Sequence, residues 1–141
     1  MIVLDTNVVS EMLRPAPNAQ VMSWLSEHSK ALTITAVTVA ELSLGLQIMP
    51  QGSRKDGLRR HLDAIFASYG DRILGLDTPA GRHYGDVVSK RRSIGRPITT
   101  EDAMIAAICL THALPLATRN CKDFDDLNLK LINPWTPPDL Q

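Results

Sequence analysis

The sequence lacks long apolar runs, and this absence excludes several classes of protein. None of its 141 residues belong to an uninterrupted apolar stretch of about 18 residues, the length that a membrane-spanning helix needs. No basic segment followed by an apolar one opens the chain, so a secretory signal is not indicated. We therefore expect a cytoplasmic protein with no membrane contact.

Cysteine is also scarce. Cys109 and Cys121 are the only two cysteines, too few for a disulfide scaffold and without the spacing of a zinc site. The four histidines are scattered along the chain and offer no ligand cluster. Cys109 lies in an apolar helical stretch, and we interpret it as a small core residue.

Charge of one sign is not in excess, because 15 lysines and arginines balance 15 acidic residues. The densest basic stretch runs from Arg82 to Arg96, with Lys90-Arg91-Arg92 at its centre. This stretch fits a solvated helix face and a phosphate-contacting patch equally well.

Short β-branched runs alternate with segments of helical period, in a length that fits one compact domain. Strands are predicted at 2–4, 32–35, 73–76, 116–118 and 130–132. Helices are predicted at about 7–13, 18–27, 37–48, 58–69, 78–92 and 100–113. This alternation favours an α/β fold with a parallel sheet covered by helices on both faces.

Two acids follow directly after predicted strands. Asp5 ends the first strand, and Asp123 lies shortly after the strand at 116–118. Ligands of open parallel sheets bind beyond the carboxyl ends of the strands, so both acids are candidates for chemistry. Each also has a structural explanation, since Asp5 can cap the next helix and Asp123 can be an ordinary loop acid.

Two further acids lie on predicted helices. Glu41 shares a helical face with Val37, Leu44 and Ile48, and we expect that apolar stripe to be buried. Glutamate is rarely buried unless it is paired or bound to a metal, which favours a functional role. The alternative is a partly exposed acid near the helix start, where the helix dipole favours it.

Asp102 lies in the first turn after Thr99-Thr100 and faces the same way as Ile105, Ala106 and Cys109. The spacing from Thr99 to Asp102 also fits a capping box, a purely structural use of the acid.

Four acids that converge are harder to explain as structure. Like charges in one crevice oppose each other's ionisation, and a divalent cation removes that cost. Mg²⁺ or Mn²⁺ prefers carboxylate oxygen, and such an ion activates water and stabilises charge on a phosphoryl oxygen. Metal-assisted hydrolysis of phosphodiester bonds is the reaction that this set suits.

Four segments in order carry a family resemblance: IVLDTN around Asp5, VTVAEL around Glu41, TEDAMIAA around Asp102, and ATRNCKDF ending near Asp123. Together with LINPW near the end, they resemble the PIN domain, and most closely the VapC-type ribonuclease toxins, including the FitB-like branch. The resemblance implies a single PIN domain over residues 1–141. It implies a three-layer α/β/α sandwich on a parallel sheet with strand order 3-2-1-4-5.

The resemblance also implies an endoribonuclease site that depends on Mg²⁺ or Mn²⁺. Asp5, Glu41, Asp102 and Asp123 match the family's catalytic and metal-binding acids. Thr6, Thr118 and Asn120 match polar positions that orient these acids or a metal-bound water.

Partners follow from the resemblance as well. Such toxins act on RNA, form homodimers, and assemble into heterotetramers or larger complexes with a cognate antitoxin protein. DNA is bound only through the antitoxin.

Two other functions compete with this one. The first is a non-catalytic PIN-like module that binds RNA or protein without cutting. The second is a phosphatase with an aspartate nucleophile, which usually carries a second Asp two residues after the first. Asn7 stands at that place, and no later lysine is an obvious candidate for its mechanism.

Overall fold

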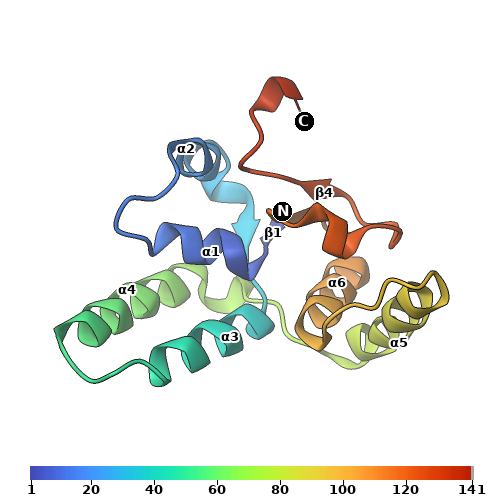
Figure 1. Cartoon of the computed structure of the whole chain (residues 1–141), viewed down its shortest axis with the longest axis horizontal. Helices are drawn as coiled ribbons and strands as arrows, with labels where there is room; N and C mark the ends of the chain where they lie inside the picture. Colours follow the sequence, from blue (N-terminus) through green and yellow to red (C-terminus); the bar gives the residue numbers. More distant parts are fainter. Residues whose placement is uncertain (141) are drawn as a thin grey trace.

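The sheet at the centre of the molecule has four short parallel strands. The computed structural model describes residues 1–140, and Figure 1 shows their arrangement. The strands are β1 (Ile2–Leu4), β2 (Leu32–Thr33), β3 (Leu116–Ala117) and β4 (Leu131–Ile132), in the order β2-β1-β3-β4. In the central strand, Val3 pairs with Thr33 on one side and with Leu116 on the other.

The strand predicted at 73–76 is wrong as a strand, because only one bridge forms there. Leu74 donates its N–H to the Ile34 carbonyl at 3.0 Å and accepts the Ala36 N–H at 2.8 Å. This parallel bridge between Thr35 and Leu74 lies beyond β2 at the edge of the sheet. The observed order, with the bridge segment in the place of the predicted third strand and followed by β2-β1-β3-β4, therefore agrees with the predicted order 3-2-1-4-5. The segment lies at the sheet edge and has a partner on one side only, so its neighbours form no ladder.

Over residues 1–140, six α-helices and four short 3-10 helices surround the sheet. The α-helices are α1 (Thr6–Met12), α2 (Ala19–Glu27), α3 (Ala36–Gln47), α4 (Ser53–Tyr69), α5 (Thr78–Ser93) and α6 (Thr100–His112). The 3-10 helices are η1 (Ser29–Ala31), η2 (Gly70–Arg72), η3 (Cys121–Phe124) and η4 (Pro138–Leu140). The helix starts follow local caps: the side chains of Asn18 and Thr99 accept the N–H groups of Val21 and Asp102.

The side chains of β1 point alternately to the two faces of the sheet, and the core has one half on each face. Val3 points into a cluster with Leu116, Ile105 and Cys109 of α6. Leu4 points the other way, into a cluster formed largely by α1 and α2. Successive strand residues face opposite sides, so three apolar residues in β1 serve both halves. In Figure 1, α5 and α6 lie on one side of the sheet and α1 and α4 on the other. The predicted α/β/α class and the buried Cys109 are confirmed.

In residues 1–140, no helix combines the length and apolarity that crossing a membrane requires.

Candidate active site

A cleft of about 420 Å³ opens at the carboxyl ends of β1 and β3. Its walls bring together three of the four predicted acids, Asp5, Glu41 and Asp102. The other residues that line it are Thr6, Asn7, Ser10, Glu11, Arg14, Arg119, Asn120 and Trp135. The cleft lies where ligands of parallel sheets bind, as the sequence predicted for Asp5.

Asp5 is held by both of its carboxylate oxygens. Oδ1 accepts the Thr6 backbone N–H at 2.8 Å, and Oδ2 accepts the Thr118 hydroxyl at 2.8 Å. The residue is only 5% exposed. Burial raises the pKa of Asp5, against the effect of these two hydrogen bonds, and the charge of Asp123 raises it further. Asp5 also caps α1, as its structural explanation predicted. The same side chain has a raised pKa, which capping alone does not explain.

Thr118 belongs to a small polar network behind Asp5. Its hydroxyl oxygen accepts the Asn120 N–H at 3.1 Å and the Asn7 side-chain amide at 3.4 Å. The hydroxyl proton is therefore free to point at Asp5. Two of the three predicted supporting residues, Thr118 and Asn120, thus bear on the orientation of Asp5.

The third supporting residue, Thr6, orients Glu41. The Thr6 hydroxyl donates to Glu41 Oε1 at 2.8 Å, and its oxygen lies 2.8 Å from the Thr38 hydroxyl. Thr6 has a single hydroxyl proton and gives it to Glu41, so Thr38 is the donor in the second bond. Burial raises the pKa of Glu41, although the Thr6 hydrogen bond opposes this.

The expected burial of the Glu41 stripe is wrong. Leu44 is 64% exposed and Ile48 is 74% exposed, although Val37 on the same face is buried. Helix α3 is apolar nearly all round, and it turns Val37, Thr38 and Leu46 inward. Glu41 thus lies at the border between the buried and exposed faces and reaches the cleft from there.

Asp102 experiences the charges of all the other predicted acids. It lies in the first turn of α6, where its backbone N–H donates to the Thr99 hydroxyl oxygen at 3.2 Å. Burial, together with the negative charges of Asp5, Asp123 and Glu41, raises the pKa of Asp102 to about 6. The residues predicted to share its face, Ile105, Ala106 and Cys109, are fully buried, so that side of α6 is fixed.

Asp123 stands at the rim and does not line the cleft. It lies in η3, is exposed to solvent, and donates its N–H to the Asn120 carbonyl at 2.9 Å. Its charge nevertheless raises the pKa of both Asp5 and Asp102. The four acids therefore act on one another electrostatically, three from the walls and one from the rim.

Arg91 holds the segment that carries Asp123. This buried side chain donates to the carbonyls of Arg96 at 2.8 Å, Asp125 at 2.9 Å and Lys122 at 3.4 Å. Arg96 forms ion pairs with Asp125 and with Asp126 at 3.7 and 3.5 Å. Two arginines of the basic stretch are thus engaged within the protein.

The chemistry of these donors fits a hard divalent cation. The side chains around the four acids offer carboxylate, hydroxyl and amide oxygens, which Mg²⁺ and Mn²⁺ prefer. Across residues 1–140, no three Asp, Glu, His or Cys side chains are placed to hold one ion directly. Mutual repulsion keeps carboxylates apart when no cation is between them, and Mg²⁺ usually binds through one or two carboxylates and several waters.

Several residues of the cleft escaped the sequence analysis. Buried Glu11 accepts the Asn18 N–H at 2.8 Å and pairs with Arg14 at 3.2 Å. The signal for this wall was the helical spacing of Asn7 and Glu11, which places both on one face of α1, with Arg14 just beyond the helix end. Trp135 belongs to the LINPW segment of the family resemblance, but that segment gave no indication that Trp135 lines the cleft.

Comparison with known proteins gives one consistent family. The PIN domain model matches residues 2–129. The VapC ribonuclease Y4jK of Sinorhizobium fredii is 37% identical over 139 residues, covering 97% of this chain and 99% of the relative. Toxin FitB of Neisseria gonorrhoeae is 39% identical over 137 residues, covering 96% and 99%. The solved structure of FitAB bound to the IR36 DNA fragment contains a chain of 35% identity with a TM-score of 0.92, covering 97% of each chain. The chain therefore belongs to the PIN domain family.

Proposed function

We propose that this protein is an endoribonuclease that depends on Mg²⁺ or Mn²⁺ and acts as the toxin of a toxin–antitoxin pair. Relatives of nearly equal length named VapC ribonuclease and toxin FitB support the class of activity. The acid-lined cleft supports metal-dependent cleavage of a phosphodiester bond.

One observation carries the proposal. Asp5, Glu41 and Asp102 line one cleft, and the charges of Asp5, Asp123 and Glu41 all raise the pKa of Asp102. A fold gains nothing from like charges that oppose each other's ionisation, so their convergence calls for a positive ligand. The structural alternatives explain each acid singly and leave the convergence unexplained.

The residues of this chain would orient the carboxylates before any ligand arrives. Thr118 and the Thr6 N–H fix the two oxygens of Asp5, and the Thr6 hydroxyl turns Glu41 toward the same cleft. Asp5, Glu41, Asp102 and Asp123 would hold the cation, directly or through water. When bound, the cation supplies stabilisation of charge on a phosphoryl oxygen and a more acidic water molecule.

The phosphatase alternative loses support from Asn7. Its side-chain amide donates to Thr118 and its Oδ1 lies 3.4 Å from the Arg119 N–H. Asn7 thus acts as an amide in the network behind Asp5, a role that an aspartate could not fill with the same donors.

The test is RNA cleavage by purified protein in Mn²⁺ with Asp5→Asn beside the wild type. Asp5→Asn should abolish cleavage and keep the fold, because the amide has nearly the same size and α1 keeps its cap. Asp63→Asn is the matched control, since Asp63 is an exposed acid on α4 outside the cleft, and it should cut normally. Full cleavage by Asp5→Asn would remove Asp5 from the mechanism. RNA binding without cleavage by the wild type would favour the non-catalytic module.

We infer that the partner is a cognate antitoxin that neutralises the toxin and carries the DNA-binding function of the complex. The match to a chain in the FitAB–DNA complex supports this assembly. Co-expression with the cognate antitoxin should yield a stable complex without ribonuclease activity. The toxin alone should not bind the promoter DNA. DNA binding by the isolated toxin would contradict the assignment.

We also infer that the protein forms a homodimer. Leu44 and Ile48 expose apolar side chains along one face of α3, beside a shallow apolar surface that includes Met104 of α6. Exposed apolar side chains that adjoin one another are typical of protein interfaces. The molar mass from light scattering should be twice that of the chain, and Ile48→Asp should reduce it to the monomer value. A monomeric wild type at micromolar concentration would contradict this inference.

A further inference from the structure

The wall of the cleft opposite the acids carries a second chemistry. Arg14, Arg119 and Trp135 line the same cavity as Asp5, Glu41 and Asp102. Arg14 is engaged by Glu11 at 3.2 Å. Within residues 1–140, no carboxylate lies in salt-bridge distance of the exposed Arg119 guanidinium. Arg119 is thus the positive group of this wall that is available to a ligand.

Trp135 holds Arg119 in place. The central guanidinium carbon of Arg119 lies 5.2 Å from the centroid of the Trp135 ring, a cation–π contact. Trp135 is half-buried and packs against the core, and its backbone N–H donates to Asn133 Oδ1 at 2.9 Å. The packing and this backbone bond fix the position of the indole beneath the Arg119 guanidinium.

Arg119, Trp135 and Asp5 all follow the carboxyl ends of neighbouring strands. Arg119 follows β3 by two residues, Trp135 follows β4 by three, and Asp5 follows β1 directly. The Arg119 N–H lies 3.4 Å from Asn7 Oδ1, which ties the loop after β3 to α1. The carboxyl ends of three adjacent parallel strands thus present Asp5 and the Arg119–Trp135 pair to the cavity that Glu41 and Asp102 reach from helices.

The charges of the cleft require such a group. Glu11 forms an ion pair with Arg14. The Asn18 N–H lowers the pKa of Glu11 most, and Arg14 and the more distant charge of Arg119 lower it as well. The three acids of the opposite wall repel any phosphate that enters. A polyanionic substrate carries further phosphates on both sides of the bond to be cut, and a bound cation does not neutralise these. Arginine presents a planar fork of donors that matches a phosphate.

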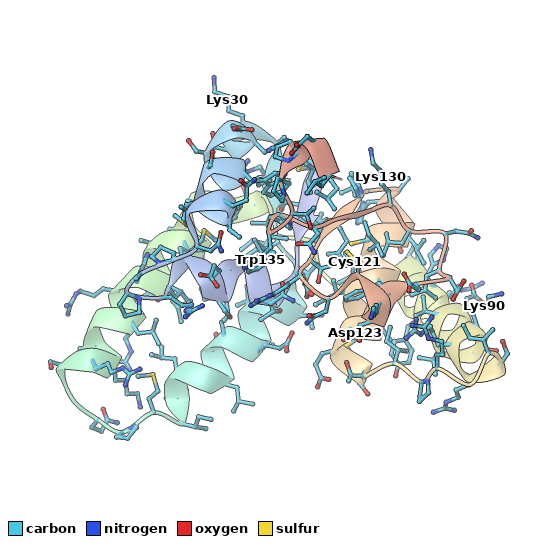
Figure 2. All side chains as sticks on the ribbon, turned by 45° about the horizontal axis from the view of Figure 1, so that its top comes forward. Lys30, Lys90, Cys121, Asp123, Lys130 and Trp135 are labelled. Carbon is cyan, nitrogen blue, oxygen red and sulfur yellow. The ribbon has the colours of Figure 1, made fainter. Side chains whose placement is uncertain are left out.

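We propose that Arg119, supported by Trp135, binds a backbone phosphate of RNA next to the scissile one. This inference rests on the proposed ribonuclease function and adds a subsite to it. The basic stretch from Arg82 to Arg96 is less suited to the task. Arg91 is buried against carbonyls, Arg96 is paired with acids, and Figure 2 shows Lys90 on the outer side of α5, far from Trp135.

The experiment measures the Kd of a labelled, uncleavable 2′-O-methyl RNA in Mn²⁺ as a function of salt. Arg119→Ala should weaken binding about tenfold, and the slope of log K against log salt should fall by about 1. Arg119→Lys should keep the salt slope but lose part of the affinity. Trp135→Leu should weaken binding less than Arg119→Ala, because the arginine remains but loses its support.

One control variant and two further measurements on Arg119→Ala separate the outcomes. Arg92→Ala removes the same charge from an exposed position on α5 and should leave Kd and salt slope unchanged. Arg119→Ala should keep the wild-type rise in melting temperature with Mn²⁺, which shows that the acids are intact. In the cleavage assay, Arg119→Ala should raise KM more than it lowers kcat.

An Arg119→Ala protein that binds RNA like the wild type, while the wild type cleaves RNA, would overturn the subsite and leave the proposed function standing. A wild type that neither binds nor cuts RNA would overturn the proposed function and the subsite together. If Arg119→Ala keeps RNA binding but escapes neutralisation by the antitoxin, this wall receives a protein and the RNA subsite is wrong.

Discussion

The hydroxyl of Thr118 donates a 2.8 Å hydrogen bond to Oδ2 of Asp5, two residues that lie 113 positions apart in the sequence. The bond exists because β1 and β3 are adjacent parallel strands that end side by side. It fixes the outer oxygen of a buried carboxylate whose other oxygen is fixed by the Thr6 N–H. Both carboxylate oxygens of buried Asp5 are thus held by donors from different segments of the fold.

Thr118→Val tests the importance of this orientation. Valine keeps the shape of threonine but leaves a buried carboxylate oxygen without its donor, which should cost about 1–3 kcal/mol of unfolding free energy. Cleavage should also fall, because Asp5 becomes free to turn. Urea unfolding in EDTA and a cleavage assay measure the two effects. Thr118→Ser keeps the hydroxyl and should lose much less of both, and equal losses in the two variants would contradict the role of the hydroxyl.

Asp102 makes the stability of the metal-free protein depend on pH. Its folded-state pKa is raised to about 6, above the value of about 4 expected for an unfolded chain. The folded protein therefore holds a proton that the unfolded chain has already released, and stability falls as pH rises from about 4 to 6. Asp102→Asn removes this loss.

The measurement is the melting temperature in EDTA between pH 4 and pH 7.5. Asp102→Asn should match the wild type most closely at the acid end, exceed it increasingly up to slightly above pH 6, and keep a nearly constant advantage from there to pH 7.5. Asp63→Asn, an exposed acid on α4, should follow the wild type throughout. A difference between Asp102→Asn and the wild type that stays constant with pH would contradict the raised pKa.

Arg91 should control the order of the segment that carries Asp123. Arg91→Met keeps the length of the side chain but leaves the carbonyls of Lys122 and Asp125 without their donor. We expect a loss of about 1–3 kcal/mol in unfolding free energy and faster amide exchange at residues 120–126. The exposed neighbour gives the control Arg92→Met, which should change neither quantity. Unaltered exchange in Arg91→Met would show that the segment is held by other contacts.

Local signals allowed much of the fold to be predicted. Asn18 and Thr99 mark helix starts because their side chains accept N–H groups a few residues away. Asp5 was a good candidate because it directly follows an apolar strand at the start of the chain. These features depend on short stretches of sequence, and the structure reproduces them.

Contacts between distant segments account for what the sequence analysis missed. The segment around Leu74 looked like a strand, but it lies at the sheet edge and forms one bridge. The apolar face of α3 predicted burial for Leu44 and Ile48, yet both are largely exposed and no other segment within residues 1–140 covers them. The Arg119–Trp135 pair depends on the adjacency of β3 and β4, which spacing along the chain does not reveal.

The most direct test of the account is the rate of RNA cleavage as a function of Mn²⁺ concentration, for the wild type and for Asp102→Ala. The account predicts no cleavage in EDTA, a rate that rises with Mn²⁺ and saturates, and loss of this activation in Asp102→Ala. Asp63→Ala should behave like the wild type in the same series. Cleavage that persists in EDTA, or an Asp102→Ala protein that cuts at the wild-type rate, would contradict a metal-dependent site built on these four acids.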